Sequence, residues 1–155
     1  MEKALYQCYI DILDEELKVA MGCTEPIALA YAGAIIKDVL QEQATKIKLT
    51  VSGNIIKNVK SVVIPNTNGM KGLIGAVSAG FVAGDAKKQL EVISQVNKEQ
   101  IEAMKTFMNT CEFEIKQSLS DCQFDLLIEA YSANHSASVH IVNYHTNVVK
   151  VCKDD

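Results

Sequence analysis

Two long segments of this sequence are apolar on nearly every side of a helix and rich in small residues. The first covers residues 27–40, with Thr24 as the expected N-cap and Pro26 in the first turn. The second covers residues 71–83 and consists largely of Gly, Ala and Ser. A helix without a polar face is buried on several sides, and its small side chains let neighbouring elements approach closely. The sequence therefore predicts a fold with two helices in its interior.

The rest of the chain predicts a sheet and amphipathic helices. Alternation of polar and apolar residues indicates a half-buried strand over residues 46–51, followed by a turn at 52–54. Helical spacing predicts amphipathic helices over residues 5–17 and 98–109, the second capped by Asn97. Residues 85–93 are weakly helical. Further short strands are predicted at residues 61–64, 112–116, 125–130, 138–143 and 147–152. We expect an α+β or α/β fold, a single domain over residues 1–155 with an N-terminal helical pair and a mixed β-sheet.

Composition excludes several classes of protein. The 155 residues are 48% apolar and 22% charged, as in an ordinary soluble domain. The net charge is −4 and the basic residues are scattered, so neither nucleic acid nor an anionic membrane is an expected partner. The first residues lack a signal-peptide pattern and no apolar run is long enough to span a bilayer, so we expect a cytoplasmic protein. The five cysteines include no CxxC pair, which argues against a disulfide framework and favours small buried thiols.

One cysteine lies where its thiol could carry chemistry. Cys23 is expected in the tight connection between two helices, just before a helix N-terminus. Free N–H groups and the helix dipole at such a position stabilise a thiolate, the form that binds iron or zinc or attacks an electrophile. Glu25, in the first helical turn, opposes that effect. The alternative, a buried Cys at a crowded turn, is favoured by position alone.

Two polar loops and two histidines complete the candidate residues. Residues 52–54 and 65–69 each follow a predicted strand, where loops present side-chain amides and backbone N–H groups to small ligands. Spacing alone favours ordinary turns as the explanation of both segments. His135 and His145 flank a predicted strand that contains His140. No acidic residue is evident beside them in the sequence, and for any single histidine a structural role is favoured.

Four blocks of the sequence together resemble a known family. They are Met21-Gly22-Cys23-Thr24-Glu25-Pro26-Ile27-Ala28-Leu29-Ala30-Tyr31-Ala32, residues 51–58, residues 64–72, and His135-Ser136-Ala137 followed by His145-Thr146-Asn147. In this order they resemble the L-cysteine desulfidase family, which is related to the alpha chain of iron–sulfur L-serine dehydratases. The blocks cover most of the chain, so the combination is more specific than any one of them.

The resemblance implies a lyase chemistry. Family members eliminate the β-substituent and then the amine of a small amino acid, so L-cysteine gives pyruvate, ammonia and sulfide, and L-serine gives pyruvate and ammonia. The resemblance implies a [4Fe–4S] cluster bound by three cysteines, with one iron open as a Lewis acid for the leaving group, and no PLP. Cys23 matches the first cluster cysteine.

We expect the candidate residues to converge on one concave, partly exposed surface. The two loops would lie at one edge of the sheet if their strands were parallel neighbours. Neutral side chains would then bind the substrate carboxylate, and a histidine would carry protons near pH 7. The predicted metal ligand is Cys23, the predicted catalytic residues are His135 and His145, and the predicted substrate-binding residues are Thr24, Ser52, Asn54, Asn66 and Thr67.

The resemblance covers only the N-terminal portion of much longer proteins, whose other cluster cysteines have no counterpart here. We therefore expect this chain to be a split subunit, a truncation or a degenerate gene product, inactive by itself. Its expected partners are a small amino-acid substrate and a second chain or C-terminal portion that carries the other cluster cysteines, or another copy of itself. The alternative function is non-enzymatic: a remnant that binds a small molecule or another subunit.

Overall fold

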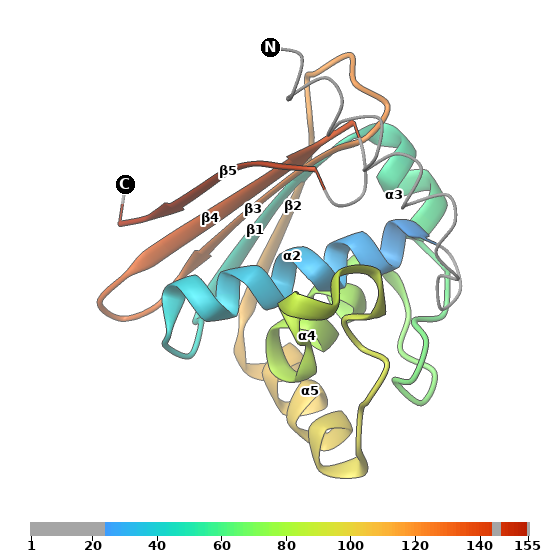
Figure 1. Cartoon of the computed structure of the whole chain (residues 1–155), viewed down its shortest axis with the longest axis vertical. Helices are drawn as coiled ribbons and strands as arrows, with labels where there is room; N and C mark the ends of the chain where they lie inside the picture. The colour runs from blue at the N-terminus through green and yellow to red at the C-terminus, as the bar shows by residue number, and fades with distance from the viewer. Residues whose placement is uncertain (1–23, 144–146, 155) are drawn as a thin grey trace.

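A five-stranded mixed sheet forms one side of the protein (Figure 1). The structure is a computed structural model that describes residues 24–143 and 147–154. The strands are β1 (Lys46–Val51), β2 (Glu112–Gln117), β3 (Asp125–Tyr131), β4 (Ser136–Val142) and β5 (Val148–Lys153). Their order in the sheet is β2-β1-β3-β4-β5; β1 and β2 are parallel and the other pairs antiparallel. The predicted α+β fold with a mixed sheet is confirmed.

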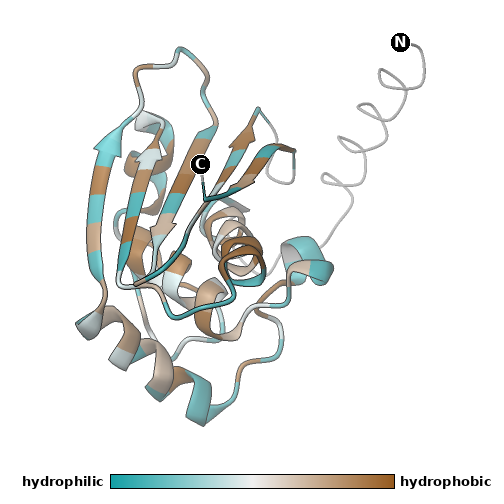
Figure 2. Ribbon diagram, turned by 90° about the vertical axis from the view of Figure 1, so that its left-hand side faces the viewer, coloured by the Kyte–Doolittle hydropathy of each residue, from teal (hydrophilic) through white to brown (hydrophobic). Residues whose placement is uncertain are grey.

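The inner face of the sheet is apolar because side chains alternate along each strand. Figure 2 shows this alternation as changing colour along the strands. Ile47, Leu49 and Val51 of β1 are fully buried, and Ile128 of β3 and Val139 of β4 lie beside them on the same face. This face packs against helix α2 (Thr24–Leu40), whose residues 26–34 are all buried.

Helix α2 is enclosed because a second helix covers its other side. Helix α4 (Gly72–Ala83) packs along α2, and α5 (Lys98–Thr110) packs against α4 (Figure 1). The backbones of α2 and α4 touch where they cross: a methyl group at Gly80 would overlap the carbonyl of Ala30, and one at Gly33 would lie 2.5 Å from the carbonyl oxygen of Val77. The predicted close approach of two buried, small-residue helices is confirmed.

Helix α5 is attached to this core by two buried side chains, Met104 and Phe107. Phe107 stacks on Phe81 of α4 with ring centroids 4.8 Å apart and meets Phe113 of β2 edge-on at 5.9 Å. The helix begins at the predicted cap, where Asn97 and Gln100 form a reciprocal capping box. The prediction of an amphipathic helix after Asn97 is therefore confirmed.

Two local predictions are wrong. Residues 52–54 are not an isolated turn, since Ser52 precedes helix α3 (Gly53–Val59), whose buried Ile55 and Val59 are one helical turn apart. Residues 61–64 do not form a strand, because the segment closes a loop in which only Val63 makes an isolated bridge, to Lys71. The weakly helical residues 85–93 contain the 3-10 helix η1 (Ala86–Glu91).

The other elements agree with the sequence-based predictions. The strands predicted in the last third of the chain correspond to β2–β5, with ends shifted by one or two residues. The predicted helix over residues 5–17 lies outside the described residues. Within residues 24–143 and 147–154, no helix has both the length and the apolar character needed to cross a bilayer.

Candidate functional site

A solvent-facing hollow lies at the end of the sheet where β1 and β4 finish and β3 begins. Its volume is about 450 Å³. We call it the amide hollow, because four of its lining residues carry side-chain amides; the lining consists of Glu25, Asn54, Ile55, Asn58, Gln123, Phe124 and Asn143. These residues come from the first turn of α2, from α3, and from the segments on either side of the β3–β4 pair.

Ser52 fixes the position of one residue that lines the amide hollow, Gln123. The Ser52 side chain is 3% exposed, and its hydroxyl donates a 2.8 Å hydrogen bond to the carbonyl oxygen of Gln123. The backbone N–H of Ser52 donates to the carbonyl oxygen of Asp125. The end of β1 is thereby joined to the start of β3, and Gln123 is held at the rim of the hollow.

The amides around the hollow are placed by backbone geometry. Asn54 and Asn58 are four residues apart on α3, so both lie on the same face of that helix. Asn143 adopts a positive φ of 72° and donates its backbone N–H to the carbonyl oxygen of Phe124. Within the described part of the chain, the side chains of Asn54, Asn58 and Asn143 make no hydrogen bond. Their amide groups are therefore oriented by the backbone and still able to bind a ligand.

A buried acid fixes the same end of the sheet from its outer face. Asp125 is 7% exposed and lies 2.7 Å from Nε2 of His140. The hydroxyl of Ser118 donates to the other carboxylate oxygen. His140 thus has the structural role that the sequence favoured for a single histidine, and its acidic partner comes from the neighbouring strand.

The structure brings together some of the predicted site residues and separates others. Asn54 lines the amide hollow, and Ser52, which does not line it, is hydrogen-bonded to the lining residue Gln123. Asn66 and Thr67 do not line it: the Asn66 amide donates to the carbonyl oxygen of Ile93, and the buried Thr67 hydroxyl donates to that of Ile64. The predicted convergence of all these residues on one surface is wrong, because Asn66 does not follow a strand parallel to β1.

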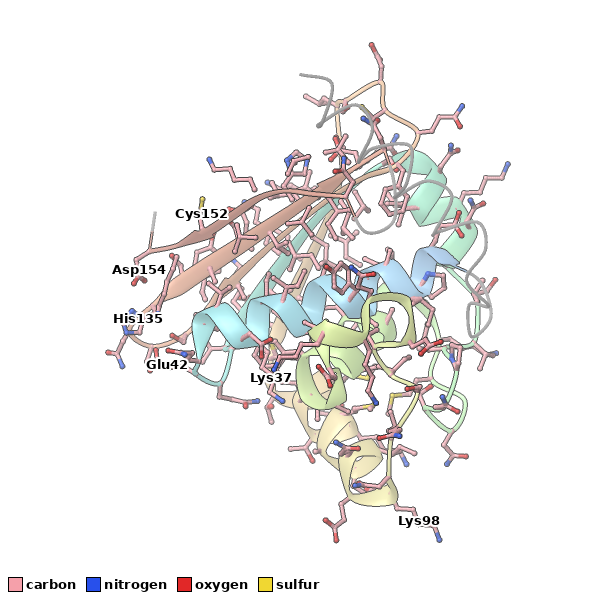
Figure 3. The ribbon with its side chains drawn as sticks, viewed as in Figure 1. Lys37, Glu42, Lys98, His135, Cys152 and Asp154 are labelled. Atoms are coloured by element: carbon pink, nitrogen blue, oxygen red, sulfur yellow. The ribbon has the colours of Figure 1, made fainter. Side chains whose placement is uncertain are left out.

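His135 lies at the opposite end of the sheet. It precedes β4, whereas Asn143 follows it, so the seven-residue strand separates them by about 26 Å. His135 Nδ1 is 2.9 Å from Asp154, and Nε2 is 3.9 Å from Glu42 (Figure 3). We call His135, Glu42 and Asp154 the His135 clasp. The structure therefore does not place His135 with Ser52 and Asn54.

The clasp carboxylates are stabilised in their charged form. The pKa of Glu42 is lowered, first by the hydrogen bonds from Ser132 and Asn134 and then by the charges of His135 and Lys153. The pKa of Asp154 is lowered, first by the backbone N–H of Ser136 and then by its hydrogen bond with His135. Each acid is already paired within the protein, which gives the clasp the character of a structural tie.

Three predicted site residues cannot be placed. Cys23 and His145 lie outside the described residues, and so does the side chain of Thr24. Both Cys23 and His145 are two positions in sequence from a residue that lines the amide hollow, Glu25 and Asn143 respectively. Their predicted roles as metal ligand and catalytic residue stay predictions.

The described cysteines do not fit a [4Fe–4S] cluster. Cys111 precedes the edge strand β2 and Cys152 lies on the opposite edge strand β5, which is four strand spacings, or about 19 Å, away. Burial and the charge of Glu112 raise the pKa of the Cys111 thiol to about 11, which disfavours the thiolate that iron requires. Among the described residues, no three His, Cys, Asp or Glu side chains gather into a metal site. Cys111 is buried, as predicted for most cysteines, whereas Cys122 and Cys152 are only partly buried.

Sequence reasoning missed Glu25 as a lining residue, and it missed Asn58, Gln123 and Asn143 altogether. The spacing of Asn54 and Asn58 would have indicated a shared face if the helical spacing of Ile55 and Val59 had been recognised. No sequence pattern indicates that Gln123 and Asn143 meet, because this depends on the antiparallel register of β3 and β4.

Comparison with known proteins identifies relatives whose names state no activity. The chain is 45% identical over 149 residues to a UPF0597 protein of Desulfitobacterium hafniense (strain Y51), covering 96% of this chain and 35% of that protein. It is also 45% identical over 149 residues to a UPF0597 protein of Finegoldia magna, covering 95% of this chain and 36% of that protein. A UPF0597 protein of Fusobacterium nucleatum is 39% identical over 146 residues, covering 94% of this chain and 34% of that protein. The chain thus spans about a third of the length of the curated relatives it matches. No protein-family model and no solved structure matches it.

Proposed function

We propose that this chain is the amino-acid-binding portion of a [4Fe–4S]-dependent lyase that converts L-cysteine or L-serine to pyruvate, with release of ammonia and of sulfide or water. The observation that carries the proposal is the amide hollow. Three exposed asparagines and one glutamine surround it, and it adjoins in sequence both Cys23 and His145. The family resemblance supplies the reaction, and the hollow supplies a place for the substrate.

The chemistry of the lining suits a small polar ligand. The NH₂ groups of Asn54 and Asn58 can donate to a carboxylate, and their carbonyl oxygens can accept from an ammonium or a hydroxyl group. Buried Ile55 and Phe124 give the hollow an apolar floor. Sites for small molecules commonly combine a few oriented polar groups with such a floor.

We assign to this chain the binding and orientation of the substrate together with the Cys23 ligand. The described residues contain no group of three His, Cys, Asp or Glu side chains that could hold a metal, so the proposal places the other ligands on a partner chain or on a further part of a longer protein. His145, next to the hollow in sequence, is the proposed proton carrier. We no longer propose this role for His135, which is paired with two acids elsewhere.

The test is to titrate the purified chain with L-serine and with L-cysteine under reducing conditions. Binding is measured from the NMR chemical shifts of the backbone amides. We expect both ligands to shift signals of α3 and of residues 123–125. Asn54→Ala and Asn58→Ala should each weaken binding about fivefold, the value of one hydrogen bond. Asn109→Ala, an exposed asparagine on α5, is the matched control and should leave the affinity unchanged. If neither L-serine nor L-cysteine binds, the proposal is contradicted.

The cluster assignment has its own test. A cluster with a single protein ligand would be lost to thiols and chelators, so we expect anaerobic reconstitution of the chain alone to give no stable cluster and no lyase activity. Iron, sulfide and absorbance are measured after gel filtration. A stoichiometric cluster that survives this step would overturn the assignment of the missing ligands to another part.

The competing function is a binding domain without lyase activity, and the separation of the described cysteines favours it. It predicts amino-acid binding at the hollow without dependence on Cys23. The Cys23→Ala variant should then bind amino acids as the natural chain does, even when the remaining two thirds of a full-length relative are supplied with it.

A further inference from the structure

We propose that strand β5 pairs with β5 of a second copy of this chain, so that the two sheets join into one. This inference does not depend on the proposed function, because no residue of β5 lines the amide hollow. Strand β5 borders β4 on one side, and none of the described strands lies on its other side (Figure 1). An unpaired edge of this kind can add a further strand.

The backbone of β5 offers hydrogen bonds on its free side. Asp154, directly after the strand, donates its N–H to the carbonyl oxygen of Ser136 in β4. Backbone groups alternate in direction along a strand, so the N–H and C=O groups of Val151 and Lys153 point away from β4. The irregularity in the β4–β5 pair lies beyond Lys150 and does not disturb this part of the strand.

Strand β5 also exposes apolar side chains. Val149 is 53% exposed and Val151 is 45% exposed. Val151 lies on the inner face of the sheet, opposite the fully buried Val139, and is exposed because it stands at the edge. A second strand beside β5 would remove part of this apolar surface from water.

An antiparallel pairing centred on Cys152 satisfies both the backbone and the charges. In this register the outward backbone groups of Val151 bond those of Lys153 in the other copy, twice by symmetry. Lys150, Cys152 and Asp154 follow one another on the outer face of the sheet, and Figure 3 shows the Cys152 thiol pointing away from the helices. Lys150 of each copy then lies directly opposite Asp154 of the other, so opposite charges meet.

The Asp154 carboxylate is already oriented for such a contact. It accepts the backbone N–H of Ser136 at 2.9 Å and lies 2.9 Å from His135 Nδ1, while its side chain is still 46% exposed. Lys150 forms no ion pair with any residue that the structure describes. A second copy would supply the partner that each Lys150 lacks.

The opposite edge strand, β2, is less suited to this pairing. Its Glu112 and Glu114 form ion pairs with Lys46, and Glu114 also pairs with Lys116. The charges of β2 are therefore balanced within the chain, whereas that of Lys150 in β5 is not. This difference favours β5 as the edge that joins two copies.

The test is to measure the oligomeric state of the full chain by analytical ultracentrifugation under reducing conditions. Pairing of one strand gives a small interface, so we expect a weak dimer with a Kd of about 100 μM. Val151→Pro removes an outward N–H that β4 does not use, and it should weaken the dimer at least about tenfold. Ile115→Pro is the matched control on β2: this residue is 41% exposed, and its N–H also points away from the sheet. It should leave the dimer unchanged.

The register has its own test. The Cys152 residues of the two copies would lie directly opposite each other, within the distance that a disulfide spans. Diamide, which takes up the two thiol hydrogens, should therefore link the copies through Cys152, and mass spectrometry identifies the linked peptide. Cys152→Ser should prevent this link, whereas Cys122→Ser, at another partly buried cysteine, should not.

Three outcomes would overturn the inference. They are a chain that stays monomeric up to about 1 mM, a dimer that Val151→Pro and Ile115→Pro weaken equally, and a dimer that diamide does not link through Cys152. Should Val151→Pro not fold, Lys150→Glu changes only an exposed side chain and places two acids opposite each other. It should weaken the dimer at least about tenfold. A monomer would leave the edge open to the remaining two thirds of a longer relative.

Discussion

The two ends of the sheet use polar side chains in opposite ways. At the amide hollow, the Ser52 hydroxyl donates to Gln123 and the Asp125 carboxylate pairs with His140, which holds the strand ends together, while exposed amides such as that of Asn54 stay available. At the His135 clasp, the exposed charged groups are paired with one another (Figure 3). Polar groups can recognise a ligand only where the fold orients them without occupying them, and the side chains of Asn54, Asn58 and Asn143 meet this condition.

One helix connects the two ends. Helix α2 begins beside the hollow with Glu25 and finishes at Leu40, two residues before Glu42 of the clasp. A change that displaces α2 should therefore affect both ends, whereas a change in the local hydrogen bonds should affect only one. The predictions that follow use this difference.

The largest effect is expected at the helix crossing. Gly80→Ala should destabilise the protein by about 3 kcal/mol or more, because the new methyl group cannot be accommodated against the carbonyl of Ala30. Urea unfolding measures the loss. Gly75→Ala on the same helix meets only ordinary contacts and should be neutral or slightly stabilising. Equal stability of the two variants would show that α2 and α4 are not in backbone contact.

The next effect should be confined to the hollow end. Asp125→Ala leaves His140 and Ser118 without their shared acceptor and should cost about 2–3 kcal/mol of unfolding free energy. Asp121→Ala, an exposed acid in the preceding loop, should cost much less. In a double-mutant cycle with His140→Ala, the two losses should not add. Full additivity would argue against the Asp125–His140 contact.

Ser52→Ala should have a smaller effect on stability and a clear one on binding. Loss of its hydrogen bonds should cost about 1 kcal/mol. The same hydroxyl holds Gln123 at the rim of the hollow. The Ser52→Ala variant should therefore bind L-serine more weakly than the natural chain, by more than its loss of stability explains. Ser61→Ala, at an exposed position after α3, is the control for both measurements.

The smallest effect is expected at the clasp, and it should depend on pH. The pKa values of Glu42 and Asp154 are lowered in the folded protein, so their stabilisation is complete above about pH 5 and is lost as the pH falls through the lowered values. The double variant Glu42→Gln, Asp154→Asn should be slightly less stable than the natural chain at neutral pH. The urea midpoints of the double variant and of the natural chain should converge when they are measured down to about pH 3. If the difference between the two midpoints instead widens as the pH falls, the direction assigned to the pKa values of Glu42 and Asp154 is contradicted.

The sequence was sufficient to predict the elements whose causes are local. The small-residue composition of α2 and α4 indicated buried helices in close contact, and Asn97 marked the start of α5. The alternation of polar and apolar residues located the strands. The failures came where local patterns compete: Ser52 suits a turn as well as a helix start, and the apolar run at 61–64 is too short to distinguish a strand from a loop.

The site was harder to predict because it depends on register. We expected parallel strands to bring two loops together, but the hollow forms because β3 runs antiparallel to both β1 and β4. That arrangement puts the end of β1, the start of β3 and the end of β4 at one place. The same arrangement puts His135 at the other end, close to an acid that is distant in the sequence. Pairings between positions 19 or more residues apart leave no trace in a single sequence.

The enclosure of α2 should also be visible in the rate at which backbone amides exchange with deuterated water. Protons of a helix covered on both sides exchange only when the whole core opens, so those of α2 should be among the slowest in the described part of the chain. Helix α3 has seven residues and one buried side, and its protons should exchange through local opening. The hollow would then have one permanent wall and one that opens and closes, and ligand binding should slow exchange in α3 far more than in α2.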